Sequence, residues 1–238
     1  MSIKYALFDF DGTLIDSNEA IISSLNYVAI KFRGKPFVEN ELDEILGKPI
    51  QEQMRFLAAR PNVTSDTNDT SDSNDNDDTE EVTTGKLVEM YRIEYRRVQD
   101  DLTKIYDGII EMLQTLKSMG VQTGIVSNKG RHGIDHGINA FDLHELIEVT
   151  VSLDDVDCPK PHEEGIFKAL NLLGADASAV SETLFMGDSG HDIETAKNAG
   201  CISVLVSWTL INMDQLMALK PDYVIQSPHE IIEIIKGR

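Results

Sequence analysis

Short apolar runs alternate with helical patterns along most of the chain. Apolar runs predict strands, and longer segments with apolar residues on one helical face predict helices. The expected strands are 5–8, 121–127, 148–152, 183–186, 203–206 and 223–225, and the expected core helices are 109–118, 133–141, 163–173, 192–199 and 230–236. This alternation is typical of parallel β-α-β units in an α/β sheet that helices cover on both faces.

A block of helical patterns separates the first strand from the second. It predicts a helix that Asp16 or Ser17 caps and that Gly34 and Pro36 end, short helices near 41–46 and 51–59, and a long helix at 86–101. We therefore expect a core formed by residues 1–15 and 105–238 and an inserted helical cap formed by residues 16–104. Because ligands of open parallel sheets bind beyond the carboxyl ends of the strands, such a cap would cover the binding site.

Residues 61–84, within the expected cap, have a different composition from the rest of the chain. They are mainly Asn, Asp, Ser and Thr, with eight acidic residues and no Lys or Arg. Such a segment buries too little apolar surface to offset its ordering entropy, so we expect a disordered acidic insertion. A calcium-binding loop is the alternative, but Asp77 stands where that loop requires glycine.

Composition narrows the choice of partners. The chain has 238 residues, 41% of them hydrophobic, and a formal net charge of −20, which disfavours binding to nucleic acid or to an anionic membrane. Anionic substrates are also repelled, so a phosphate site would need a cation or a cluster of donors. No signal peptide or membrane-spanning run is apparent, and we expect a cytoplasmic protein whose Cys158 and Cys201 are reduced. No pattern indicates an oligomeric state.

The segment from Phe8 to Gly12 contains the first candidate site residues. Side chains two residues apart in extended backbone point the same way, so Asp9 and Asp11 are expected to project together at the end of the first strand. Paired carboxylates repel, and a fold keeps them when a cation lies between them or when they act as acid and nucleophile. A solvated strand end at an Asp-Gly turn is the alternative interpretation.

Polar residues also follow later strands. Ser127 and Asn128 could donate to a phosphate oxygen, Lys160 lies between two prolines and could neutralise a phosphate, and Asp188 stands four residues before Asp192. Each feature alone is compatible with an ordinary turn, a surface lysine or a helix cap. Together with the first acidic pair they form an oxygen-rich set at one sheet edge, which suits Mg²⁺ and phosphate.

These motifs together resemble those of the haloacid dehalogenase (HAD) superfamily, in family order and over nearly the whole chain. They read Asp9-Phe10-Asp11-Gly12-Thr13-Leu14, Ser127-Asn128, Lys160-Pro161 and Gly187-Asp188-Ser189-x-x-Asp192. The helical cap is similar to that of the C1-capped branch, which contains phosphoglycolate phosphatases, and the later half looks closest to bacterial pyrophosphatases. The resemblance implies a Rossmann-like core and hydrolysis of a small phosphorylated metabolite.

The resemblance also implies a role for each motif residue. Asp9 would be the nucleophile that forms an aspartyl-phosphate, and Asp11 would be the general acid and then the general base. Mg²⁺ would be held by the Asp9 carboxylate, the Asp11 carbonyl and Asp188, with Asp192 in support. The residues that would hold the phosphoryl group are Ser127, Asn128 and Lys160.

Two other interpretations stay open. A sugar-phosphate mutase shares the two motif aspartates, and a non-catalytic binding or regulatory protein could use the same scaffold. The complete set of Asp9, Asp11 and Asp188 favours an enzyme over a binding protein. Lys48 in the cap and Arg131 after the serine-asparagine turn are weaker candidates for contacts to the rest of the substrate.

Overall fold

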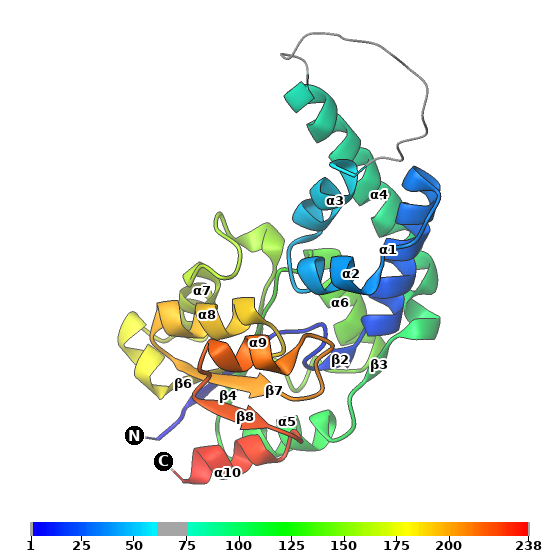
Figure 1. Cartoon of the computed structure of the whole chain (residues 1–238). Helices are drawn as coiled ribbons and strands as arrows, with labels where there is room; N and C mark the ends of the chain where they lie inside the picture. The colour runs from blue at the N-terminus through cyan, green and yellow to red at the C-terminus, as the bar shows by residue number, and fades with distance from the viewer. Residues whose placement is uncertain (1, 61–75, 238) are drawn as a thin grey trace, which may run out of the picture. The chain divides into compact units, whose positions relative to one another are not determined.

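The computed structural model describes residues 2–60 and 76–237. The chain divides into two compact units, one formed by Met1–Asp16 and Lys104–Arg238 and the other by Ser17–Thr103 (Figure 1). Residues 61–75 of the expected acidic insertion lie outside the described residues. No helix in the described parts of the chain is both long enough and apolar enough to cross a membrane.

The larger unit is built on a six-stranded sheet, counted over the described residues, in which each neighbouring pair is parallel. The strands are β1 (Tyr5–Phe8), β4 (Gln122–Val126), β5 (Val149–Val151), β6 (Thr183–Gly187), β7 (Ile202–Val206) and β8 (Tyr223–Ile225). Their order is β5-β4-β1-β6-β7-β8, so β1 lies near the centre. Phe8 is in register with Ile125 and Met186, so the chain leaves these three strands at the same edge of the sheet.

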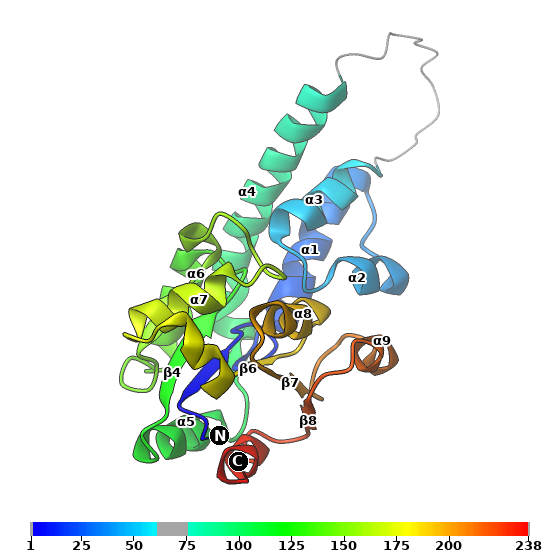
Figure 2. The same cartoon turned by 90° about the vertical axis from the view of Figure 1, so that its left-hand side faces the viewer.

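Helices cover both faces of this sheet. They are α5 (Ile109–Ser118), α6 (Arg131–Ala140), α7 (Glu164–Leu172), α8 (Gly190–Ala199), α9 (Met213–Ala218) and α10 (Glu230–Lys236). Ala6 and Phe8 pack in one apolar cluster with residues of α5, α6 and α10, whereas Leu7 packs in a second cluster with residues of α7 and α8. Figure 2 shows α5 and α10 on the opposite side of the sheet from α7 and α8. The two clusters follow from the period-two alternation along each strand.

The predicted α/β fold class is confirmed, and all six predicted strands are present with ends displaced by at most one residue. Helix α9 was not predicted, and neither was a short antiparallel pair, β2 (Ile15–Asp16) with β3 (Lys104–Ile105). These elements have six residues or fewer, which is too short for a periodic pattern to stand out. The β2–β3 pair joins the two points at which the chain leaves and re-enters the larger unit.

The smaller unit is helical in its described residues. It contains α1 (Asn18–Arg33), α2 (Glu39–Ile45), α3 (Ile50–Ala58) and α4 (Asn76–Leu102). These helices bury an apolar cluster of their own, which includes Leu25, Val28, Met54, Leu57 and Leu87. Helix α1 ends at Gly34, as predicted, with a φ of 75° that glycine adopts without steric cost.

The predicted start of the long helix was wrong. Helix α4 begins at Asn76 and not near residue 86, so residues 76–84 of the expected disordered insertion are helical. The prediction rested on the scarcity of apolar residues in this segment, which is not the only influence on helix formation. Acidic residues are favourable in the first turns of a helix, because they oppose the positive end of its dipole.

A buried ion pair stabilises the smaller unit. The Arg33 side chain is 2% exposed, and its Nη1 and Nη2 donate to Glu41 Oε1 and Oε2 at 2.7 Å and 2.5 Å. Hydrogen bonding from Arg33 is the main reason that the pKa of Glu41 is lowered to about 2. Because that pKa is lower in the folded state, the pair stabilises the fold above the unfolded pKa and loses this effect as pH falls towards 2.

We predict that Glu41→Gln lowers the free energy of unfolding of this unit by about 3 kcal/mol at pH 7, because it leaves the Arg33 charge buried without its counter-charge. Urea unfolding at pH 7 and pH 3 measures the effect, and the difference from the wild type should shrink at the lower pH. Glu89→Gln is the matched control, because Glu89 pairs with Arg96 at 3.4 Å on the exposed surface and should contribute less than about 1 kcal/mol. Equal losses in the two variants would contradict the prediction.

Candidate active site

Asp9 directly follows the central strand β1 and is only 8% exposed. Its N–H donates to the Met186 carbonyl at 2.8 Å, which fixes the backbone at the edge of the sheet. Burial raises the pKa of the Asp9 carboxyl to about 6, with Lys160 opposing the shift and Asp192 adding to it. The charge of this carboxylate therefore depends on the cations that face it.

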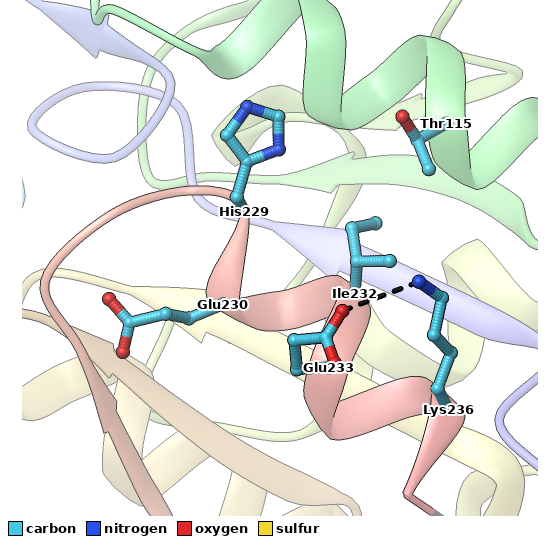
Figure 3. A pocket seen from close by; sticks show the side chains of 6 residues that line it. All are labelled: Thr115, His229, Glu230, Ile232, Glu233 and Lys236. Carbon is cyan, nitrogen blue, oxygen red and sulfur yellow. Dashed lines mark hydrogen bonds and ion pairs between the residues drawn. The ribbon is translucent and has the colours of Figure 1, made fainter.

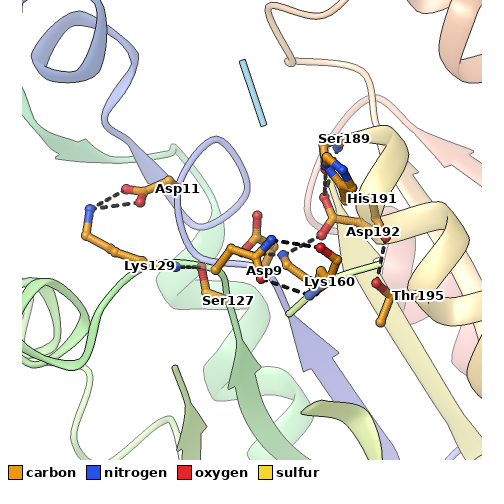
Figure 4. Close-up of polar contacts among 10 residues, drawn as sticks. Asp9, Asp11, Ser127, Lys129, Lys160, Ser189, His191, Asp192 and Thr195 are labelled. Carbon is orange, nitrogen blue, oxygen red and sulfur yellow. Dashed lines mark hydrogen bonds and ion pairs between the residues drawn. The ribbon is translucent and has the colours of Figure 1, made fainter. Parts of the chain in front are cut away.

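Lys160 joins two buried carboxylates (Figure 4). Its Nζ lies 2.8 Å from Asp9 Oδ1 and 2.6 Å from Asp192 Oδ1. Lys160 and Asp192 are 6% and 2% exposed, so water screens these contacts weakly. Burial alone would lower the pKa of Lys160, but the carboxylates of Asp192 and Asp9 outweigh it and raise that pKa. The lysine is therefore a permanent positive charge at this edge of the sheet.

Asp188, at the end of β6, completes a group of three acids. Carboxylate oxygens of Asp9, Asp188 and Asp192 lie within 4.8 Å of one another. Burial, followed by the charges of Asp192 and Asp9, raises the pKa of Asp188 well above its usual range. Thr209 Oγ1 donates to Asp188 Oδ2 at 3.2 Å. Three acids this close repel one another, and a divalent cation between them would remove that repulsion.

Two glycines make room for these carboxylates. A Cβ on Gly12, whose φ is +74°, would lie 2.4 Å from Asp188 Oδ2, and a Cβ on Gly187 would lie 2.2 Å from Asp192 Cγ. Asp9 Oδ1 is buried and lies 2.8 Å from the Lys160 ammonium nitrogen. Three carboxylates this close, with one lysine ammonium among them, form an oxygen-rich cradle that fits a hard cation such as Mg²⁺.

Ser127 and Asn128 follow β4, the strand next to β1. Ser127 is buried, its Oγ accepts from the Lys129 N–H at 3.3 Å, and its hydroxyl donates to the Asp9 carboxylate. Asn128 Oδ1 accepts from the Lys160 N–H at 2.9 Å, and Asn128 Nδ2 donates to the Lys160 carbonyl at 3.1 Å. The Asn128 amide therefore positions the Lys160 backbone, and its predicted contact with phosphate gains no support.

The loop that carries Lys160 is held from both sides by further hydrogen bonds. The Glu164 carboxylate accepts from the N–H groups of Asp157 and Cys158 at 3.0 Å and 2.9 Å. On the other side of the lysine, Asn198 Nδ2 donates to the Pro161 carbonyl at 2.9 Å. These contacts fix the backbone on which the buried lysine depends.

Asp11 does not point to the same place as Asp9. Strand β1 ends at Phe8 and the backbone bends at Phe10, so the alternation of extended backbone no longer applies between the two acids. Lys129 Nζ lies 2.8 Å from both Oδ1 and Oδ2 of Asp11. Figure 4 shows the Asp11 side chain turned towards Lys129 and away from the contact between Asp9 and Lys160. The expectation that Asp9 and Asp11 project together was therefore wrong.

Two residues that contact the site acids were not predicted from the sequence. Lys129 directly follows Ser127 and Asn128, and a cation at the carboxyl end of a central strand was a signal for it. Thr209 follows β7 and reaches Asp188. It also lies at the carboxyl edge of the sheet, so the reasoning that identified the other strand ends could have found it.

The weaker candidates are placed differently. The Arg131 guanidinium donates to the Asp155 carboxylate and to the Thr150 carbonyl. The side chain that was predicted to contact substrate is therefore already hydrogen-bonded within the protein. Lys48 belongs to the smaller unit and lies between α2 and α3, where its carbonyl accepts from Gln53 Nε2 at 2.7 Å. Neither environment adds support for a contact with substrate.

An open hollow between α5 and α10 is separate from these strand ends (Figure 3). Its lining residues are Thr115, His229, Glu230, Ile232, Glu233 and Lys236. Lys236 and Glu233 form an exposed ion pair at 3.3 Å, one helical turn apart. None of the lining residues belongs to the group of Asp9, Asp188 and Asp192, so the hollow adds nothing to the candidate site.

The fold and the strand-end residues define a hydrolase of the haloacid dehalogenase type. A family model of haloacid dehalogenase-like hydrolases matches residues 6–206. The chain therefore belongs to this family, and the predicted superfamily is confirmed.

Curated relatives match almost the whole chain. Pyrophosphatase PpaX of Bacillus mycoides (strain KBAB4) is 34% identical over 235 residues, which cover 99% of this chain and 98% of that protein. Pyrophosphatase PpaX of Halalkalibacterium halodurans is 32% identical, with the same coverage. The family match and these relatives confirm the prediction of an enzyme of the phosphatase class.

Solved structures agree with the fold. A predicted phosphoglycolate phosphatase from Haemophilus somnus 129PT has a TM-score of 0.79 and 22% identity, with 98% of each chain covered. A haloacid dehalogenase-like hydrolase from Streptococcus pneumoniae has a TM-score of 0.75 and 21% identity, also with 98% of each chain covered. At this level of identity the likeness concerns the fold.

Proposed function

We propose that the protein is a Mg²⁺-dependent phosphatase that hydrolyses pyrophosphate through an aspartyl-phosphate intermediate. The observation that carries the proposal is the group of three carboxylates, from Asp9, Asp188 and Asp192, with Lys160 bonded between two of them. The curated relatives support pyrophosphate as the substrate, because pyrophosphatases match this chain from end to end.

The residues present can supply each function that the reaction requires. Asp9, Asp188 and the Asp11 carbonyl would hold Mg²⁺, with Asp192 in support. The bound cation would supply the positive charge that lets an anionic phosphate approach the carboxylates. Donors to the phosphoryl oxygens would be Ser127 and Lys160.

The reaction then takes place in two displacements. An Asp9 carboxylate oxygen attacks phosphorus as the bond to the bridging oxygen breaks, and Asp11 gives its proton to the departing phosphate. Water next attacks the phosphorus of the aspartyl-phosphate, and Asp11 takes a proton from this water. The second phosphate leaves, and the Asp9 carboxylate is restored. Lys160 keeps Asp9 ionised, which matters because burial alone raises the pKa of Asp9.

Removal of the metal is the test of this function. We predict that release of inorganic phosphate from pyrophosphate falls at least about 100-fold in excess EDTA and returns when Mg²⁺ is added in excess, because the carboxylates otherwise repel the substrate. Because pyrophosphate itself binds Mg²⁺, the chelation is repeated with p-nitrophenyl phosphate. Release that is unaffected by chelator on both substrates would contradict the role of the metal.

A substrate panel decides the finer assignment. Phosphoglycolate, sugar phosphates and nucleoside monophosphates are compared with pyrophosphate by kcat/KM. A higher value for phosphoglycolate would replace pyrophosphate as the substrate. Conversion of a sugar phosphate to its isomer in the presence of a sugar bisphosphate, with little free phosphate, would identify a mutase instead.

A further inference from the structure

We propose that Lys129 is a positioning residue that holds the Asp11 carboxylate on the leaving-group side of the active site. The inference rests on the proposed function and deepens it, because it states how the general acid is oriented. Lys129 lies outside the motifs Ser127-Asn128 and Lys160-Pro161 on which the assignment of the site was based.

The contact is bidentate and partly buried. Lys129 Nζ lies 2.8 Å from each oxygen of Asp11, and the two side chains are 13% and 22% exposed. Contact through both oxygens restricts rotation of the Asp11 carboxylate, whereas contact through one oxygen would leave the carboxylate free to rotate. The partners follow two adjacent strands, β1 and β4, so the ion pair also joins two turns at the edge of the sheet.

Helix α6 is shaped to admit the lysine side chain. A Cβ on Gly133 would lie 2.6 Å from Lys129 Cε, and a Cβ on Gly137 would lie 2.6 Å from Cζ of Phe10. Lys129 Nζ in turn lies 5.8 Å from the centre of the Phe10 ring. Glycine inside a helix is destabilising relative to alanine, so two glycines four residues apart indicate a packing requirement on that face. The requirement here is space for Phe10 and Lys129.

The two site lysines separate the two motif acids. Lys160 contacts Asp9 and Asp192, whereas Lys129 contacts Asp11. Without Lys129, Asp11 would be free to turn towards the positive charge of Lys160 and to add a further carboxylate to the crowded group around it. Lys129 therefore keeps the acid apart from the nucleophile. An acid that acts on the leaving oxygen must lie on the side of phosphorus opposite the nucleophile, because attack and departure occur in line.

The test is the dependence of kcat/KM on the leaving group. Aryl phosphates with uncharged substituents are compared for the wild type, Lys129→Met, Lys129→Arg and Asp11→Asn. We expect Lys129→Met to lose about 10- to 100-fold on phenyl phosphate, whose leaving group needs a proton, and less than about 3-fold on p-nitrophenyl phosphate. Lys129→Arg should recover part of the loss, and adding Lys129→Met to Asp11→Asn should have little further effect.

Gly133→Ala provides a second variant in which the lysine is retained. The added methyl group displaces the lysine stem, so the loss should again be larger on phenyl phosphate than on p-nitrophenyl phosphate. Lys4→Met is the matched control, because Lys4 is 59% exposed and pairs with Glu182 on the surface, and it should leave both rates unchanged.

Three results would overturn the inference. Equal losses on every aryl phosphate would show that Lys129 only supports the fold. An unchanged leaving-group dependence with a raised KM for pyrophosphate would show that Lys129 binds the second phosphate of the substrate. A wild-type protein that releases no phosphate from any substrate would overturn the proposed function itself, and this is apparent before any variant is made.

Discussion

Asp9→Asn is expected to reduce phosphate release at least about 10⁴-fold, which is the largest effect that we predict for a single substitution. Asparagine has almost the same shape as aspartate, but its amide oxygen is a poor nucleophile and cannot form the aspartyl-phosphate. Release of inorganic phosphate from pyrophosphate in Mg²⁺ measures the loss. Mass spectrometry of the wild type, quenched in acid during turnover, should detect the phosphorylated chain, which the variant should lack.

The same substitution should not destabilise the fold in the absence of metal. Asp9 is buried near Asp188 and Asp192, and its raised pKa means that the fold disfavours its charge. A neutral side chain removes that cost, and Lys160 keeps its contact with Asp192 at 2.6 Å. Urea unfolding in EDTA should therefore give a stability equal to or above that of the wild type. A large drop in stability would mean that the lost activity reflects unfolding.

Asp214→Asn is the matched control for this experiment. Asp214 is exposed in the first turn of α9, in the same unit of the chain. Its substitution makes the same change in charge and should leave phosphate release unchanged. Residual activity of Asp9→Asn above about 1% of the wild type would show that another group is the nucleophile.

The strands, and the edge of the sheet at which the candidate site lies, were predictable because they follow from the local pattern of apolar residues and from the alternation of strands with helices. Tyr5–Phe8 is a buried run in the sequence and a buried strand in the structure, and its neighbours follow from the alternation of strands with helices. The carboxyl ends of parallel strands meet at one edge whatever the details of packing. For that reason Asp9, Asp188 and Asp192 could be brought together from sequence alone, as could Lys160.

The pairing of side chains beyond the strands was not predictable in the same way. Asn128 and Lys129 are adjacent polar residues in one turn, yet the first binds the Lys160 backbone and the second binds Asp11. The choice depends on the path of the turn and on partners that are distant in sequence. Gly133 appears in the sequence only as a weak helix former, whereas the structure shows that a Cβ there would strike Lys129.

Lys160→Met is expected to have the second-largest effect, because it alters stability and activity together. It removes the positive charge between Asp9 and Asp192, which are 8% and 2% exposed. Breaking a buried pair in this way costs about 3–5 kcal/mol. Phosphate release should fall about 10³-fold, since the variant also lacks a donor to the phosphoryl oxygens. Urea unfolding and phosphate release measure the two effects, with Lys4→Met as the exposed control.

The pH dependence of stability distinguishes this explanation from a simple loss of packing. The pKa of Asp9 is already raised to about 6 with Lys160 in place, and removing the lysine raises it further. When the pKa of a carboxyl group is higher in the folded than in the unfolded state, the protein becomes less stable as pH rises towards the folded-state pKa. In EDTA, Lys160→Met should therefore be less destabilised at pH 5 than at pH 8, whereas a packing defect would cost the same at both.

A double variant separates the two effects of the lysine. In Lys160→Met with Asp192→Asn, only one of the two carboxylates that faced the lysine remains, so the repulsion is relieved. Stability at pH 8 should recover by at least about half of the loss, because the cost of the single variant is an uncompensated buried charge. Activity should stay low, because the donor to the phosphoryl group is still missing. Recovery of both would show that Lys160 acts in catalysis only by keeping the site folded.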